Sequence, residues 1–146
     1  MSDSSDFSFG DDSVAGAYAD VLVPILFEPW ARGLIELNQA WAGCDVLDLA
    51  TGTGIVAQLL ANKVGTSGAV VGMDMNQEML NAAKIRAESF ENLTFALSSA
   101  EQLDCEDSYF DHVVCQQGFQ FFSDREASSR EIHRVLKAGG SVLLSV

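Results

Sequence analysis

The chain has 146 residues, which is the size of one domain and short for a two-domain enzyme. Hydrophobic residues make up 48% of the sequence and charged residues 20%, a composition that excludes an intrinsically disordered chain. The 8 basic and 21 acidic residues give a formal net charge of −13. This charge argues against nucleic-acid binding through phosphate contacts and favours a cationic small-molecule ligand.

The first part of the chain consists of an acidic tail and a helical region. Residues 1–13 are polar, and we expect them to be mobile. They contain no basic cluster before an apolar run, and no apolar run approaches the roughly 18 residues of a membrane helix, so we expect a cytoplasmic protein. A helical pattern extends from Val14 to about Leu37, and Pro24 and Pro29 should divide it. We expect one folded domain over residues 14–146.

Short apolar runs then alternate with amphipathic ones. The expected strands are Asp45–Leu49, Ala69–Met73, Leu93–Leu97, Phe110–Cys115 and residues 141–146. The expected helices are Ile55–Lys63, residues 77 to about 89 behind the N-cap Asn76, and one that begins at a capping box of Ser123 and Glu126 and stops at Gly139-Gly140. This alternation predicts an α/β fold with a doubly wound, mostly parallel sheet of about five strands. Ligands of such sheets bind at the carboxyl ends of the strands.

The first expected strand leads through a turn of small residues, ATGTG, directly into a helix. Gly52 and Gly54 allow the backbone to turn tightly and to approach a ligand closely. With Ala57 the turn reads G-x-G-x-x-A, which matches the dinucleotide-binding fingerprint. Asp74 ends the second strand, where a carboxylate can accept hydrogen bonds from ribose hydroxyls. The turn by itself leaves a nicotinamide dinucleotide and S-adenosylmethionine open as ligands.

Asp48 distinguishes between these two ligands. It lies at the end of the first strand, just before the turn, where its carboxylate would repel a pyrophosphate at low dielectric. The same carboxylate favours a ligand with an ammonium and a sulfonium group. S-adenosylmethionine carries both groups, together with a ribose and an adenine.

The cysteines and histidines give no sign of a metal site. Cys44, Cys105 and Cys115 include no CxxC pair, and His112 and His133 are not spaced as metal ligands. We expect reduced, mostly buried thiols and no bound metal.

Five segments occur in the order seen in class I S-adenosylmethionine-dependent methyltransferases: VLDLATGTG, VVGMD, SSAEQLDCEDSYFD, VVCQQGFQFF and EIHRVLKAGGSVLLSV. On these motifs, residues 14–146 resemble the ubiquinone/menaquinone-biosynthesis-like (methyltransferase type 11) group of that family. The resemblance implies a Rossmann-like core. The family usually adds a C-terminal antiparallel hairpin, whereas this chain stops inside or just after the fifth strand. We therefore expect an incomplete domain, with a homodimer or a partner chain covering the strand edge.

The resemblance also implies which residues surround the methionine end of the cofactor. The residues of the turn that should line it are Ala50, Thr51, Gly52 and Gly54. Asp48 should attract the ammonium group, and Gln116 should contribute a backbone carbonyl. Tyr18 matches an aromatic residue that closes over the cofactor, although simple packing within its helix is an equally open interpretation.

The nucleoside end of the cofactor is implied in the same way. Asp74 should bind both ribose hydroxyls, and Met75 should pack on the adenine. Ser99 and Ala100 match the positions that contact the adenine edge. The family often has Asp where this chain has Ser99, and the neighbouring Glu101 is expected to compensate.

Methyl transfer is an in-line displacement at a sulfonium carbon, so the protein supplies mainly proximity and alignment. No catalytic base can be assigned, because His112 lies within a strand and His133 on a helix surface. Phe119, Phe121 and Phe122 can line an apolar substrate pocket or simply pack in the core. The resemblance implies methyl transfer from S-adenosylmethionine, with S-adenosylhomocysteine as the product, to a small apolar molecule. A non-catalytic cofactor-binding subunit and a nicotinamide-dependent oxidoreductase stay open as alternatives.

Overall fold

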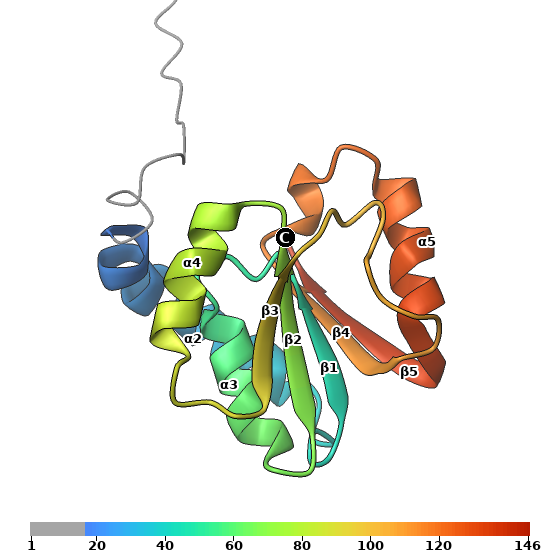
Figure 1. Ribbon diagram of the computed structural model, residues 1–146, viewed down its shortest axis with the longest axis horizontal. Coiled ribbons are helices and arrows are strands. Elements are labelled where there is room, and N and C mark those ends of the chain that lie inside the picture. Colours follow the sequence, from blue (N-terminus) through green and yellow to red (C-terminus); the bar gives the residue numbers. More distant parts are fainter. Residues whose placement is uncertain (1–16) are drawn as a thin grey trace, which may run out of the picture.

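A computed structural model describes residues 17–146 of the chain (Figure 1). The acidic residues 1–13 and the side chain of Tyr18 lie outside the described part. Five strands form one parallel sheet in the order β3-β2-β1-β4-β5, which confirms the predicted α/β doubly wound fold. The strands are β1 (Asp45–Leu49), β2 (Ala69–Asp74), β3 (Leu93–Leu97), β4 (Phe110–Gln116) and β5 (Leu136–Ser145).

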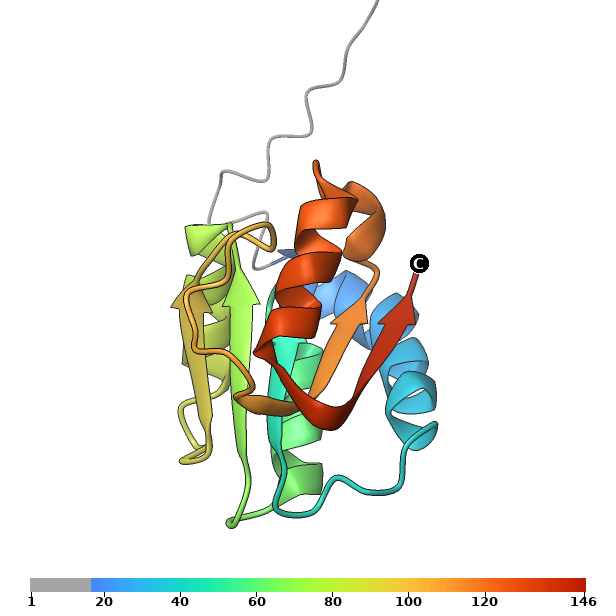
Figure 2. The same cartoon turned by 90° about the vertical axis from the view of Figure 1, so that its right-hand side faces the viewer.

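Helices cover both faces of this sheet (Figures 1 and 2). The helical elements are η1 (Tyr18–Phe27), α2 (Glu28–Glu36), α3 (Ile55–Val64), α4 (Gln77–Arg86), η2 (Phe119–Phe121) and α5 (Arg125–Val135). The elements α2, α3 and α4 lie on one face of the sheet, and α5 lies on the other. No helix within residues 17–146 is both long and apolar enough to span a membrane.

Successive residues of each strand point to opposite sides of the sheet. Both sets of side chains are largely apolar, so both faces of the sheet are apolar. In β1, Val46 packs with the buried residues of α2 and α3, whereas Leu47 and Leu49 pack with those of α5. Asp48 shares the side of Val46, and it is the buried charged residue of this strand. A near-continuous apolar run with one carboxylate therefore places that carboxylate inside the protein, close to the carboxyl end of β1.

The beginning and end of α5 differ from the sequence prediction. Asp124 is the N-cap, since its carboxylate accepts a hydrogen bond from the backbone N–H of Ala127 at 2.9 Å, whereas the predicted cap Ser123 donates its hydroxyl to Glu101. The helix ends at Val135, and Leu136 pairs with Phe110 as the first residue of β5. The glycines at 139 and 140 therefore lie within β5, next to an irregularity in its pairing with β4.

The two prolines of the N-terminal region also have different roles. Pro29 lies in the first turn of α2, where the missing N–H costs nothing, so the predicted boundary near this residue is confirmed. The prediction that Pro24 interrupts the helix is wrong, because this residue lies inside η1. A helix can continue past an interior proline at the cost of the missing N–H bond and a local distortion, and η1 is π-helical, not α-helical.

Candidate functional site at the carboxyl ends of the strands

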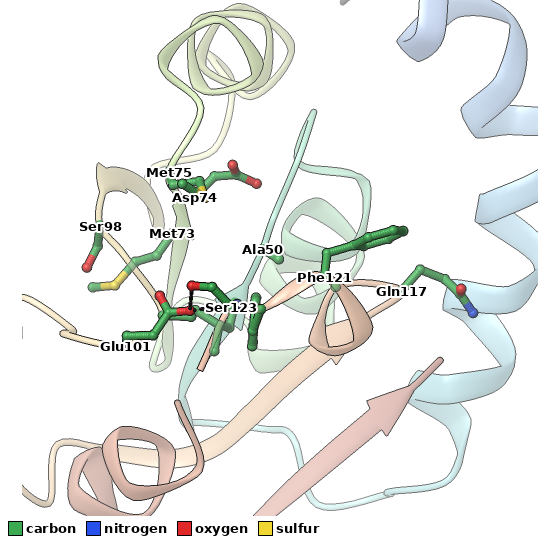
Figure 3. A pocket seen from close by; sticks show the side chains of 13 residues that line it. Ala50, Met73, Asp74, Met75, Ser98, Glu101, Gln117, Phe121 and Ser123 are labelled. Atoms are coloured by element: carbon green, nitrogen blue, oxygen red, sulfur yellow. Dashed lines mark hydrogen bonds between the residues drawn. The ribbon is translucent and has the colours of Figure 1, made fainter. Parts of the chain in front are cut away.

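Two adjoining cavities lie at the carboxyl end of the sheet. One has a volume of about 380 Å³, and we call it the β2/β3 cavity; its lining includes Met73, Asp74, Met75, Ser98, Ala100 and Glu101 (Figure 3). The other has a volume of about 450 Å³, and we call it the β1/β4 cavity; its lining includes Phe27, Asp48, Gly52, Ile55, Gln116 and Gln120. Both cavities are also lined by Ala50, Gln117 and Phe121, so a single elongated ligand can occupy the two.

The turn after β1 contributes to the lining of both cavities. Its residues Ala50, Gly52 and Gly54 have positive φ angles of 57°, 56° and 84°. At Ala50 this conformation is strained, which is typical of functional loops. A Cβ on Gly118 would lie 2.6 Å from the Cβ of Ala50, so the chain after β4 packs directly on this turn because Gly118 has no side chain. The turns after β1 and β4 therefore form one compact wall.

Asp74 fixes the turn from the neighbouring strand. Its Oδ2 accepts a hydrogen bond from the backbone N–H of Gly52, and its Oδ1 accepts one from the backbone N–H of Asn76, both at 2.9 Å. A carboxylate has about four lone-pair sites, so each oxygen keeps a site for a further donor. Asp74 lines the β2/β3 cavity beside the exposed side chain of Met75. This arrangement suits a ligand that presents two adjacent hydroxyl groups.

Asp48 is the buried carboxyl group of the β1/β4 cavity, with 1% of its surface exposed. Its Oδ2 accepts a hydrogen bond from the hydroxyl of Thr51 at 2.6 Å. Burial raises the pKa of Asp48 to about 7, and the charge of Asp74 adds to this rise, against the hydrogen bonds from Thr51 and from the backbone of Ala57. A cationic group in this cavity would favour the ionised form.

Glu101 connects the segment after β3 to the start of α5. Its Oε2 accepts a hydrogen bond from the hydroxyl of Ser99 at 2.5 Å. Its Oε1 accepts bonds from the backbone N–H and hydroxyl of Ser123 and from the backbone N–H of Asp124, at 3.0 to 3.3 Å (Figure 3). These donors, with that of Ser99 the strongest, hold the pKa of Glu101 at about 2. Glu101 thus joins two walls of the β2/β3 cavity.

Most of the predicted site residues meet at the two cavities. Those that line one or both are Asp48, Ala50, Gly52, Asp74, Met75, Ala100, Glu101 and Gln116. Three other predicted residues lie beside the cavities without lining them: Thr51, Gly54 and Ser99. Thr51 is buried and bonded to Asp48, Gly54 is the N-cap of α3, and the hydroxyl of Ser99 is bonded to Glu101.

Several lining residues were not predicted from the sequence, among them Ser98, Gln117 and Gln120. The dense polar and aromatic segment QQGFQFF was the available signal for the two glutamines, because it directly follows β4. Neither histidine lines either cavity. His112 lies in the first half of β4, where its Nδ1 is 2.7 Å from the hydroxyl of Ser141 and its ring packs on Trp41.

The comparison with known proteins agrees with this geometry. Residues 12–145 match the ubiE/COQ5 methyltransferase family. The chain belongs to this family. A ubiquinone/menaquinone biosynthesis C-methyltransferase UbiE from Hydrogenovibrio crunogenus is 35% identical over 139 residues, which cover 91% of this chain and 55% of that protein. This family member spans about half the length of the curated relatives it matches.

Solved structures show the same fold. A SAM dependent methyltransferase from Aquifex aeolicus is 27% identical, with a TM-score of 0.76 over 87% of this chain and 68% of its own. A chain in the complex between the Haloferax volcanii Trm112 methyltransferase activator and the putative methyltransferase is 25% identical, with a TM-score of 0.81 over 91% of this chain and 58% of its own. Residues 17–146 of this family member thus form a Rossmann-like class I methyltransferase core; the described part contains the parallel strands without an antiparallel hairpin.

Proposed function

We propose that this chain binds S-adenosylmethionine and takes part in methyl transfer to a small molecule. The observation that carries the proposal is the pair of carboxylates in adjoining cavities: Asp74, which has free lone-pair sites beside the β2/β3 cavity, and the buried Asp48 of the β1/β4 cavity. One suits a ribose, and the other suits a positively charged group. Family membership supports the same assignment.

The residues present fit this cofactor. Asp74 and Met75 would hold the nucleoside in the β2/β3 cavity, whose lining also includes Ala100. Asp48 and the turn at Gly52 would hold the methionine portion in the β1/β4 cavity. When bound, the cofactor supplies a methyl group on a sulfonium centre. The protein's own task is then to orient both ligands and to exclude water, and Phe121, which lines both cavities, is placed to do so.

We propose an apolar methyl acceptor, because Phe27, Ile55, Val56 and Phe121 line the β1/β4 cavity. The similarity to the ubiquinone/menaquinone biosynthesis C-methyltransferases UbiE makes aromatic quinone precursors the first acceptors to assay. The second candidate is a subunit that binds the cofactor without turnover. Methylation assays on such acceptors, with and without candidate partner proteins, distinguish the two.

Calorimetric titration with S-adenosylhomocysteine tests the cofactor assignment. We expect the wild-type chain to bind it more tightly than it binds NADH. Asp74→Ala should weaken this binding by about 1–3 kcal/mol, the range for lost hydrogen bonds to an ionised group. Asp104→Ala, which changes an exposed carboxylate outside both cavities, serves as the matched control. Unchanged affinity in Asp74→Ala would exclude the ribose contact, and absence of any wild-type binding would exclude the function.

A further inference from the structure

The thiol of Cys115 adjoins the turn after β4. Cys115 is the last residue but one of this strand, has no exposed surface, and lies in the buried cluster that includes Leu47 and Leu49. Its sulfur is 3.0 Å from the position that a Cβ on Gly118 would take, and that position is 2.6 Å from the Cβ of Ala50. The sulfur, Gly118 and the turn after β1 therefore form one continuous contact.

Two backbone N–H groups of the turn after β4 have no oxygen acceptor. The N–H of Gln117 donates to the carbonyl of Ser145 at 2.8 Å. For the next two N–H groups, those of Gly118 and Phe119, residues 17–146 provide no oxygen or nitrogen acceptor. The sulfur of Cys115 accepts from both. A thiol sulfur is a weak acceptor, but a buried N–H with no acceptor at all is rare in native proteins, so these two bonds complete the turn.

The thiol of Cys115 stays protonated at neutral pH. Burial raises the pKa of Cys115 to about 12, and the charges of Asp48 and Asp74 add to this rise, against the N–H groups of Gly118 and Phe119. Such a thiol is a poor nucleophile, because the thiolate is the reactive form. What this side chain can contribute is therefore its packing and the hydrogen bonds that its sulfur accepts.

The turns on either side of this contact are strained. Ala50 and Gln117 have positive φ angles of 57° and 54°, which residues with a side chain seldom adopt. Such conformations persist only where the surrounding structure holds them in place. Both residues line both cavities, so a displacement of either turn changes the shape of the two cavities together.

We propose that Cys115 is a positioning residue for the cofactor site, whose sulfur holds the turn after β4 against the turn after β1 by accepting hydrogen bonds from Gly118 and Phe119. Cys115 itself lines neither cavity, so it acts through the wall that Ala50, Gln117 and Gly118 contribute. The inference rests on the proposed function where it concerns the affinity for the cofactor.

The variants Cys115→Val and Cys115→Thr separate the acceptor from the packing. The two new side chains have nearly the same shape, but only that of threonine has an atom that accepts hydrogen bonds. Cys115→Val should weaken the binding of S-adenosylhomocysteine about five- to tenfold, the range for lost hydrogen bonds of ordinary strength. Cys115→Thr should bind nearly as well as the wild type, although the buried hydroxyl lowers its stability. The more stable variant should thus be the weaker binder, whereas a role in packing alone would change affinity and stability together.

Hydrogen exchange measured by NMR tests the two hydrogen bonds without any ligand. Relative to the amides of β4, those of Gly118 and Phe119 should exchange slowly in the wild type and in Cys115→Thr, and about tenfold faster in Cys115→Val. Val113→Ala is the matched control, because Val113 is a buried residue of the same strand and the same cluster, three positions before the end of β4. It should lower the urea concentration of unfolding without a change in affinity or in the relative exchange of the two amides.

Several results would overturn the proposal. An equal loss of affinity in Cys115→Val and Cys115→Thr would assign the effect to packing. Wild-type affinity in both variants would show that the sulfur does not position the site. Rapid exchange of the Gly118 and Phe119 amides in the wild type would show that the two bonds do not hold the turn, and this measurement requires no variant to fold. Failure of the wild-type chain to bind S-adenosylhomocysteine would instead reject the proposed function, and the exchange rates would still decide whether the sulfur holds the turn.

Discussion

Asp48 combines burial with a carboxyl group that titrates near neutral pH. Its pKa is raised to about 7, so lowering the pH through 7 protonates the group in the free protein. An ammonium ligand favours the ionised form, and binding therefore releases a proton. We expect the affinity for S-adenosylhomocysteine to decrease from pH 8 to pH 6, by at most about tenfold per unit below pH 7. Calorimetric titrations at pH 6, 7 and 8 measure this effect.

Two controls make the pH prediction specific to this residue. Asp48→Asn keeps an acceptor for the hydroxyl of Thr51 but cannot ionise, so its affinity should vary much less over the same pH range. 5′-Methylthioadenosine has no ammonium group, and its binding to the wild-type chain should be less sensitive to pH. An equally steep pH dependence in Asp48→Asn would assign the titration to another group.

At the residue scale, the sequence predicted those contacts that follow from strand ends. Asp48 is the last residue but one of β1 and Asp74 is the last residue of β2; the carboxyl ends of these neighbouring parallel strands share one edge of the sheet, so the proximity of the two residues could be expected from the sequence. The partners of Ser99 and Glu101 could not be predicted in this way. The hydroxyl of Ser99 donates to the carboxylate of Glu101, and this carboxylate also accepts a hydrogen bond from Ser123, more than twenty positions further along the chain. Only the folded arrangement brings these groups together.

At the element scale, Glu101 holds the two residues that precede α5, Ser123 and Asp124, against the segment after β3. Glu101→Ala removes the acceptor for Ser99, Ser123 and Asp124, so we expect a loss of about 1–3 kcal/mol in the free energy of unfolding. The affinity for S-adenosylhomocysteine should fall as well, because these residues adjoin the β2/β3 cavity. Urea denaturation and calorimetry measure the two effects.

The acid range gives a further check on Glu101. Its native pKa of about 2 lies below the ordinary glutamate value, so its contribution is complete above about pH 4.5 and is lost as the pH falls toward 2. The stability difference between wild type and Glu101→Ala should shrink over that range. Glu106→Ala, at an exposed position nearby, should have almost no effect. If Glu101→Ala unfolds at the same urea concentration as the wild type, the connection does not stabilise α5.

Element boundaries were the weaker part of the sequence prediction, and α5 shows why. Ser123 and Asp124 are both good N-caps, and local sequence does not choose between them. Glu101 decides between them, because its carboxylate accepts a hydrogen bond from the hydroxyl of Ser123. The carboxylate of Asp124 then accepts the hydrogen bond from the backbone N–H of Ala127. Similarly, Leu136 joins β5 because it pairs with Phe110, before the glycines that were expected to end the helix.

At the scale of the whole molecule, alternation of strands and helices was sufficient to predict a parallel sheet, because parallel neighbours require crossover helices. Within residues 17–146, the two edges of this sheet are β3 and β5. The β5 edge exposes apolar side chains: Val142 and Leu144 are 39% and 42% exposed, and a groove lined by Trp30, Leu37 and Leu144 lies between β5 and α2. An apolar strand edge with unpaired backbone groups favours association with another chain.

We therefore expect this chain to self-associate as its concentration rises, through the β5 edge. Leu144→Lys should shift the equilibrium toward the monomer, because a charge at the edge opposes strand pairing and burial in an apolar contact. Sedimentation velocity over a concentration series measures the shift, and circular dichroism confirms that the variant is folded. The matched control is Ile85→Lys, which changes an exposed apolar residue of α4, the helix between β2 and β3 and thus outside the β5 edge. If both variants and the wild type sediment identically at every concentration, the β5 edge does not mediate association.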